Sequence, residues 1–195
     1  METKPPDSQV DGGFVMGSRA VMALSGGMDS TSLLLRLLRD GYNVTCVSYE
    51  YGQKHSIEIE RAKENIQRLQ SKGLGVKHKI IDLSSAMGTF HSALTKQNYE
   101  VPEGYYEEIQ MKQTVVPNRN AIFSSILYGM ALSISQSEDV DVIVALGVHS
   151  GDHAIYPDCR PEFYKALSDA FSIGNWESER VTFELPYISG EKSTI

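Results

Sequence analysis

Residues 20–30 read AVMALSGGMDS and decide the fold of this 195-residue chain. The run from Ala20 to Leu24 is short, apolar and bounded, which is typical of a strand buried in a sheet. It leads into Ser25-Gly26-Gly27, and from about Ser30 leucines recur at helical spacing as far as Asp40-Gly41, where glycine suits a left-handed helix end. We therefore expect a strand, a glycine-rich turn and a helix, an arrangement that binds phosphate groups at the helix N-terminus.

The pattern of alternating strands and helices continues along the chain. Strands are expected at Asn43–Tyr49, Val76–Leu83, Asp141–His149 and Val181–Leu185, and helices at Ser56–Ser71, Asn118–Ser137 and Pro161–Ile173. Alternation of this kind predicts an α/β fold with an open, mostly parallel sheet and helices on both faces, which is Rossmann-like.

Two segments fall outside this pattern. Residues 1–18 carry acids and Pro-Pro, lack a secretory signal and are expected to form a disordered N-terminal extension before a single domain at 19–195. The stretch from Ser84 to Pro117 has weak periodicity, and we expect a short helix followed by a long excursion over the active face.

Composition excludes several classes of protein. The chain has 18 Lys and Arg against 25 Asp and Glu, so its net charge of -7 argues against a broad nucleic-acid surface and favours a small anionic substrate. Apolar runs such as Val142 to Leu146 are far shorter than the roughly 20 residues of a membrane span. Cys46 and Cys159 are the only cysteines, which excludes a disulfide framework and a cysteine-based zinc site and fits a reducing, cytoplasmic location.

The stretch Ser25-Gly26-Gly27-Met28-Asp29-Ser30 is the most specific chemical signal. Gly26 and Gly27 allow the backbone to approach an anion, and the Ser25 and Ser30 hydroxyls are expected to add donors. The pattern differs from both Gly-x-Gly-x-x-Gly and the Walker loop. The alternative is a glycine-rich turn that only caps a helix.

Three polar clusters should lie beside this turn, because each follows an expected strand or begins an expected helix. They are Tyr51-Gly52-Gln53-Lys54-His55, Val116-Pro117-Asn118-Arg119-Asn120 and the loop from Gly147 to Arg160. Asn118 is expected to cap its helix, while Arg119 offers a two-pronged donor for phosphate or carboxylate. Each cluster also has a plain structural explanation as a polar or capping loop.

Ser-Gly-Gly-x-Asp-Ser resembles the motif of the PP-loop ATP pyrophosphatases, whose fold is of the adenine nucleotide alpha hydrolase type. With Tyr-Gly-Gln-Lys-His, Val-Pro-Asn-Arg-Asn and Tyr-Pro-Asp-Cys-Arg-Pro-Glu-Phe, the chain from about Arg19 to its end closely resembles the 7-cyano-7-deazaguanine synthase family. Tyr156 to Phe163 is the most diagnostic of these motifs.

The resemblance implies an ATP-dependent carbon-nitrogen ligase of the queuosine and archaeosine pathways. Its small-molecule substrates would be 7-carboxy-7-deazaguanine and ammonia, and its cofactors ATP and Mg²⁺. The carboxylate would be adenylated, converted to an amide, adenylated again and released as the nitrile, with AMP and pyrophosphate as products. The resemblance also implies a homodimer, while the net charge and the short apolar runs argue against direct contact with nucleic acid or a membrane.

Site residues follow from the same resemblance and from the chemistry of the side chains. Catalytic roles are expected for Asp29, Lys54, His55, Arg119 and Asp152, with Asp29 also holding Mg²⁺. ATP would contact Leu24, Ser25, Gly26, Gly27, Met28, Asp29, Ser30, Thr31, Tyr49 and Lys192. The deazaguanine would contact Gln53, Asn118, Arg119, Asn120, His149, Asp152, Tyr156, Asp158 and Arg160. The proton lost by ammonia would pass to His55, His149 or Asp152, between which the residues do not decide, and Cys159 is expected to pack or contact substrate.

The chain departs from the family in two respects. Asn118 stands where many relatives have glycine, and the family's four zinc-binding cysteines, spaced Cys-x8-Cys-x2-Cys-x2-Cys, would follow Ile195. Zinc is therefore not expected in this chain, and it looks cut short or naturally reduced.

Three alternatives stay open. One is a different PP-loop enzyme, such as an amidotransferase-type ligase or a tRNA thiolase. The second uses the activated deazaguanine carboxylate to modify a macromolecular amine. The third is a non-catalytic nucleotide-binding module.

Overall fold

The computed structural model describes residues 18–52, 57–90, 116–149 and 156–189. The expected N-terminal extension, apart from Ser18, and most of the expected excursion between Ser84 and Pro117 lie outside the described residues. Of that excursion, the short helix is present as α3 (Ser84–Met87), as predicted.

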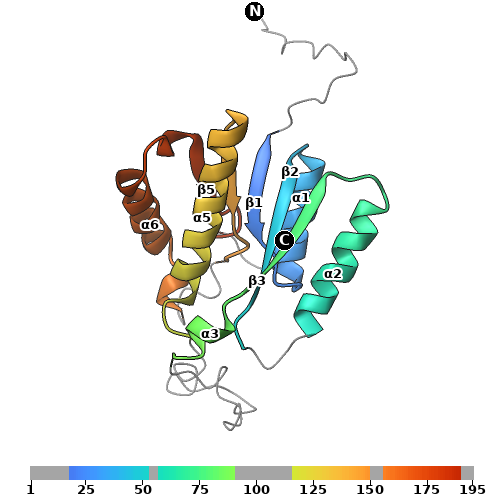
Figure 1. Cartoon of the computed structure of the whole chain (residues 1–195), viewed down its shortest axis with the longest axis horizontal. Helices are drawn as coiled ribbons and strands as arrows, with labels where there is room; N and C mark the ends of the chain where they lie inside the picture. The colour runs from blue at the N-terminus through green and yellow to red at the C-terminus, as the bar shows by residue number, and fades with distance from the viewer. Residues whose placement is uncertain (1–17, 53–56, 91–115, 150–155, 190–195) are drawn as a thin grey trace, which may run out of the picture.

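Five strands form one sheet: β1 (Arg19–Ala23), β2 (Asn43–Glu50), β3 (Val76–Asp82), β4 (Val142–Ala145) and β5 (Val181–Glu184). Their order across the sheet is β3-β2-β1-β4-β5, and every neighbouring pair is parallel (Figure 1). The predicted open parallel sheet is confirmed.

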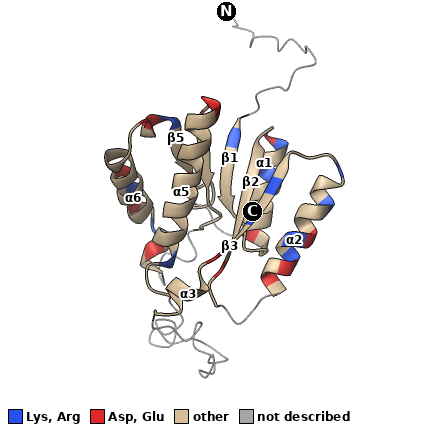
Figure 2. Cartoon of the chain, viewed as in Figure 1, with Lys and Arg blue, Asp and Glu red and all other residues tan. Residues whose placement is uncertain are grey.

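Helices cover both faces of the sheet, as expected (Figure 1). α1 (Met28–Arg39) and α2 (Ile57–Gln70) pack on one face, where Leu33 and Leu34 meet the buried Met22 and Val44. α5 (Arg119–Glu138) and α6 (Pro161–Gly174) pack on the other, where Leu127 lies with the buried Val21 and Val144. Acidic and basic residues both occur along the outer surface of α2, consistent with its predicted amphipathic character (Figure 2).

Two predicted boundaries were wrong. α1 begins at Met28 instead of near Ser30, because the Thr31 amide already donates to the Gly27 carbonyl at 3.1 Å. Asp29 therefore lies in the first turn of the helix. β4 ends at Ala145 and does not reach His149, because its pairing with β1 stops at Met22 and the chain then turns toward α1 at Gly147.

The strand order reverses direction beside β1, since β2 lies on one side of it and β4 on the other. In open α/β sheets, ligands bind outside the carboxyl ends of the strands at such a switch point. The glycine-rich turn after β1 and the loop after β4 meet there.

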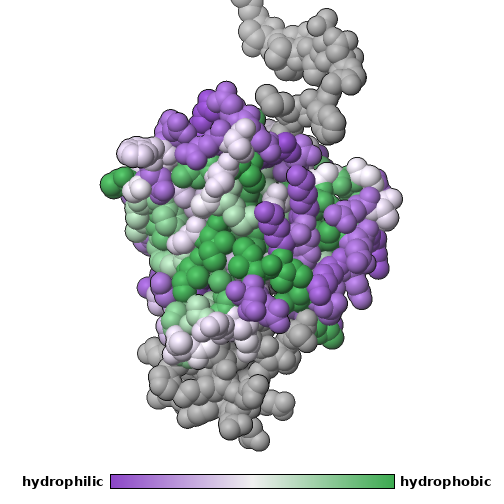
Figure 3. Space-filling model, in the orientation of Figure 1, coloured by the Kyte–Doolittle hydropathy of each residue, from purple (hydrophilic) through white to green (hydrophobic). Residues whose placement is uncertain are grey.

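A larger hollow of about 750 Å³ lies away from these loops, where α5 leaves part of the sheet uncovered. Apolar side chains gather on this face of the molecule (Figure 3), and its lining includes Ile126, Met130 and Ile134 of α5. Lys77 and Lys79 of β3 line its other side. The hollow contains none of the chemical motifs predicted from the sequence.

Candidate active site

The glycine-rich turn is held tightly between β1 and the first turn of α2. Gly26 has φ +85°, a left-handed backbone conformation that residues other than glycine rarely adopt. A Cβ atom at this position would lie 2.2 Å from the Glu58 carbonyl oxygen, which is backbone and cannot move aside easily. Glycine is therefore required at position 26 both by its conformation and by the close approach of α2.

The Ser30 side chain holds the turn together through hydrogen bonds to Ser25 and Gly27. Its buried hydroxyl donates to the Gly27 carbonyl at 3.2 Å and accepts from the Ser25 amide at 3.3 Å, with the Ser25 hydroxyl 3.0 Å away. The Gly27 amide in turn donates to the Ser25 hydroxyl at 3.3 Å. In this conformation the Ser30 hydroxyl shapes the turn, and its expected contact with phosphate stays a prediction.

Asp29 and His149 bring the β1 and β4 loops together. Asp29 Oδ2 lies 3.9 Å from Nε2 of His149, whose side chain is only 3% exposed. Gly147 permits this approach, because a Cβ atom there would lie 3.3 Å from the Ser30 amide nitrogen. The first turn of α1 therefore presents a carboxylate beside the free amides at its N-terminus, where anionic groups are stabilised.

The second oxygen of Asp29 fits a magnesium ion. Oδ1 is buried, and among the described residues it has no hydrogen-bond partner. Mg²⁺ prefers oxygen ligands and is commonly held by one or two carboxylates together with substrate phosphates. Within 18–52, 57–90, 116–149 and 156–189, no group of three His, Cys, Asp or Glu side chains is arranged for a metal, so phosphate oxygens would complete the shell. The expectation about zinc concerns cysteines beyond residue 195 and stays untested.

The start of α5 connects two of the predicted clusters, the one at 116–120 and the loop from Gly147 to Arg160. Asn120 accepts from Arg119 Nε at 3.3 Å and donates to the Asp158 carbonyl at 3.4 Å. Its amide also lies 3.8 Å from Cys159 Sγ in the short helix η2 (Pro157–Cys159). Asn120 thus fixes Arg119 and η2 relative to each other.

Asn118 occupies the N-cap position of α5, as predicted, but its side chain does not cap the helix. It precedes α5 with φ +59° and ψ +16°, and its side chain makes no capping hydrogen bond, although its carbonyl accepts from the Ile122 amide at 3.1 Å. Glycine and asparagine are the residues that tolerate this left-handed conformation best. The conformation accounts for an asparagine at this position.

These elements enclose a cavity of about 360 Å³ at the carboxyl end of the sheet. Nine predicted site residues line it: Leu24, Ser25, Gly27, Met28, Asp29, Ser30, Tyr49, Arg119 and Asn120. Three prominent lining residues are absent from the predicted set: Ser48, Phe123 and Tyr164. Tyr51 also lines the cavity and belongs to the predicted cluster at 51–55. Phe123 is one helical turn beyond Arg119 and Asn120, so helical spacing on α5 was the signal for it.

Aromatic rings form one wall of the cavity. Tyr49 and Phe123 stack with ring centroids 3.9 Å apart, and Tyr51 tilts against Phe123 at 5.5 Å. The Tyr49 hydroxyl donates to the Phe123 carbonyl at 3.0 Å, and burial raises the pKa of Tyr49 well above its usual value. Burial likewise raises the pKa of Tyr164. Both phenols are therefore neutral, and neither is suited to act as a base near neutral pH.

The remaining predicted residues fall into two groups. Gly26, Thr31, Asn118, His149, Tyr156, Asp158 and Arg160 are described but do not line the cavity itself. Gln53, Lys54, His55, Asp152 and Lys192 lie outside the described residues, so their predicted roles stay predictions.

The sequence as a whole is similar to proteins of one family. The family profile described as "Queuosine biosynthesis protein QueC" matches residues 19–195. The 7-cyano-7-deazaguanine synthase of Caldicellulosiruptor saccharolyticus is 44% identical over 91% of this chain and 73% of its own length. Those of Alteromonas mediterranea and Methanoregula boonei are 43% and 42% identical, and the chain covers 77% and 76% of their lengths.

The fold also has a solved counterpart. A predicted tRNA methyltransferase subunit from Methanocaldococcus jannaschii superimposes with a TM-score of 0.54 over 91% of this chain and 71% of its own. At 18% identity this likeness concerns the fold alone. No helix in the described part of the chain is long and apolar enough to cross a membrane.

Proposed function

This chain belongs to the family of the queuosine biosynthesis protein QueC, and from that premise we propose that it converts 7-carboxy-7-deazaguanine and ammonia to 7-cyano-7-deazaguanine. The reaction consumes two ATP and releases two AMP and two pyrophosphates. The enzyme is thus a ligase of the queuosine pathway that works on small molecules.

The first step makes the carboxylate reactive. One of its oxygens attacks the α-phosphorus of ATP, the bond to the β-phosphate oxygen breaks, and pyrophosphate leaves. The turn at Ser25–Gly27 and the amides opening α1 lie where they would bind the departing pyrophosphate. Arg119, on the same cavity, would hold an oxygen of the phosphate or the carboxylate.

Asp29 would hold Mg²⁺ through Oδ1, the buried oxygen without a partner among the described residues. When bound, the ion would neutralise charge on the phosphates as pyrophosphate departs. The other oxygen of Asp29 faces His149 and would keep that imidazole oriented.

Ammonia then attacks the carbonyl carbon of the acyl-adenylate, AMP leaves and an amide forms with loss of one proton. His149 is the one of the three expected proton acceptors that lies within the described residues, and it is buried beside the carboxylate of Asp29. We therefore assign His149 as the acceptor. His55 and Asp152 stay as the other candidates.

The amide oxygen attacks the α-phosphorus of a second ATP and pyrophosphate leaves. Loss of AMP together with both remaining amide protons then gives the nitrile. Each AMP therefore carries away one oxygen of the original carboxylate. No protein nucleophile is needed, and Cys159, buried at the cavity wall, has no covalent role in this scheme. Catalysis would depend on positioning and electrostatic stabilisation.

The main support for the proposal is that the glycine-rich turn, Asp29 and Arg119 line one cavity in a chain of this family. The test is to incubate the purified chain with Mg-ATP, 7-carboxy-7-deazaguanine and ammonium and to follow the small molecules by mass spectrometry. The nitrile with two AMP per product is expected. AMP with only the amide favours transfer to a macromolecular amine, and ATP binding without AMP leaves a nucleotide-binding module.

A further inference from the structure

A chain of two hydrogen bonds links β3, β2 and the end of β1, next to the glycine-rich turn. Ser48 on β2 donates to the carbonyl of Leu24 at 2.6 Å, and its Oγ also lies 2.8 Å from Nε2 of His78 on β3. Ser48 is 2% exposed and Leu24 is 1% exposed, so both ends of the first bond are shielded from water. Ser48 also lines the active-site cavity.

The direction of each bond follows from the chemistry of the groups. A carbonyl oxygen only accepts, so the single hydroxyl proton of Ser48 points to Leu24. Ser48 must then accept in its contact with His78, which requires a hydrogen on Nε2. The chain thus runs from the His78 ring through the Ser48 hydroxyl to the Leu24 backbone.

Leu24 is the last residue before the turn. β1 ends at Ala23, and the Leu24 amide donates to the Val47 carbonyl at 2.8 Å. Together with Ser48, this bond ties both polar groups of the Leu24 backbone to β2 just before Ser25 leaves the sheet.

We propose that His78 is a positioning residue for nucleotide binding: by donating to Ser48 it fixes the Leu24 carbonyl and thereby the path of the phosphate-binding turn. This inference rests on the proposed function for its ligand, ATP. His78 itself does not line the cavity, so it acts only through Ser48.

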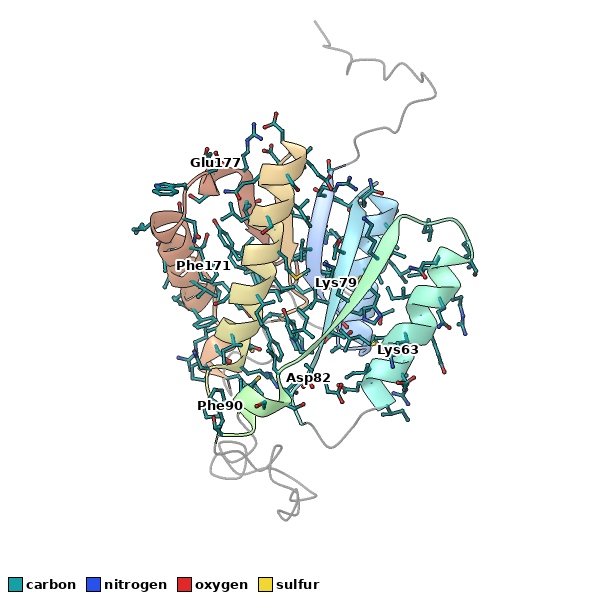
Figure 4. The ribbon with its side chains drawn as sticks, in the orientation of Figure 1. Lys63, Lys79, Asp82, Phe90, Phe171 and Glu177 are labelled. Atoms are coloured by element: carbon teal, nitrogen blue, oxygen red, sulfur yellow. The ribbon has the colours of Figure 1, made fainter. Side chains whose placement is uncertain are left out.

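The surroundings of His78 support this assignment. His78 is two residues from Val76 on the same strand, and Val76 packs with Ala62 and Ile66 of α2, so the ring lies on the face of the sheet that α2 covers. Lys63 of α2 (labelled in Figure 4) is a cation whose charge acts on the ring. Burial first and the charge of Lys63 second lower the pKa of His78, so the ring is neutral near pH 7. A neutral ring carries a single hydrogen, and the chain requires that hydrogen on Nε2.

The tautomer can be observed without any ligand. Long-range nitrogen-proton NMR spectra of the histidine rings, assigned by loss of one ring in His78→Gln, should show His78 protonated on Nε2 and bare on Nδ1. A neutral ring protonated on Nδ1 would overturn the proposal, whatever the protein does with ATP.

Variants test the consequence. Ser48→Ala and His78→Leu should each weaken ATP binding by calorimetry about tenfold, since a buried carbonyl or hydroxyl is left without its partner. Ser48→Thr keeps the hydroxyl and His78→Gln keeps a donor at the same reach, so both should bind ATP within about threefold of the parent. The double variant Ser48→Ala/His78→Leu should bind no more weakly than Ser48→Ala, because both changes break one chain.

The matched control is Ser135→Ala. Ser135 is also a buried serine that donates to a backbone carbonyl, that of Val140 at 2.7 Å, but it lies at the far end of α5. It should lose a similar amount of stability with unchanged ATP affinity. Equal losses of ATP affinity in Ser135→Ala and in His78→Leu would show that His78 affects ATP binding only through the stability of the fold, and would overturn the proposal.

The kinetic readout separates this inference from the proposed function. In the assay for AMP, His78→Leu should raise the KM for ATP about tenfold and leave the KM for 7-carboxy-7-deazaguanine unchanged. If the parent chain makes no AMP, the proposed function fails. The tautomer of His78, and the change in the NMR shifts of the Ser25, Gly26 and Gly27 amides between the parent and His78→Leu, then still test the positioning role of His78. Unmoved amides would overturn it.

Discussion

The carboxylate of Asp29 lies 3.9 Å from the imidazole of His149, joining the first turn of α1 to the loop that follows β4. One oxygen of Asp29 faces this ring, and the other is buried without a hydrogen-bond partner among the described residues. A buried oxygen without a hydrogen-bond partner is uncommon in a folded protein, and it points to a ligand in place of a structural role.

Replacing Asp29 by Asn should separate activity from stability. The change keeps the shape of the side chain but removes its charge, so AMP formation should fall by about 10²-fold or more. The melting temperature should change little, because Oδ1 makes no hydrogen bond among the described residues that the substitution would remove. Rates of AMP release and thermal unfolding measure the two effects.

Asp169→Asn is the matched control for that change. Asp169 is an exposed carboxylate paired with Lys165 at 2.7 Å on α6, remote from the cavity. It should leave AMP formation unchanged. A drop in stability of Asp29→Asn with proportionate loss of activity would show that Asp29 is structural.

Gly26→Ala should be far more damaging than Gly41→Ala. Both glycines have φ near +85°, at which alanine costs about 1–2 kcal/mol. The added Cβ meets open space at Gly41 but the Glu58 carbonyl at Gly26. Urea unfolding should therefore show a larger loss of free energy for Gly26→Ala, and equal losses would contradict the tight packing of the turn on α2.

Position 118 should tolerate glycine and reject a β-branched residue. Because φ is +59°, Asn118→Gly should fold as stably as the parent, while Asn118→Val should lose about 1–3 kcal/mol in denaturant unfolding. If Asn118 capped α5 through its side chain, both variants would be destabilised alike.

The sequence predicted the sheet and its helices well because their apolar residues are local and periodic. The leucines of α1 and the apolar positions of α2 identify their buried faces directly. Boundaries were less predictable where tertiary contacts decide them. β4 is shortened because Gly147 turns the chain onto the first turn of α1, a contact between residues far apart in the sequence.

Site residues show the same division. Ser25, Asp29 and Arg119 were predicted from motifs and line the cavity. Ser48 was not predicted, since a serine within a strand carries no local chemical signal. Phe123 was missed although it lies one helical turn beyond Arg119. The left-handed backbone of Asn118 was missed because asparagine is common both at that conformation and as a residue that caps a helix through its side chain.

His78 should make stability depend on pH in a defined direction. Its pKa is lowered from 6.5 in the folded chain, so between the lowered value and 6.5 the unfolded chain binds a proton that the folded chain does not. The stability that His78 contributes is complete above about pH 6.5. It is lost as the pH falls below 6.5 and through the lowered pKa of the folded chain. Urea unfolding at roughly pH 7.5 and 5.5 should show that the parent loses more stability on acidification than His78→Gln. Identical losses in the two proteins would contradict the shift.

The most direct test of the whole account follows the oxygens of the substrate. With 7-carboxy-7-deazaguanine labelled with oxygen-18 in both carboxylate positions, each AMP released should carry one labelled oxygen and the nitrile none, as mass spectrometry would show. Unlabelled AMP formed at the same rate would mean that water, and not the carboxylate, attacks ATP, and it would contradict carboxylate adenylation at this site.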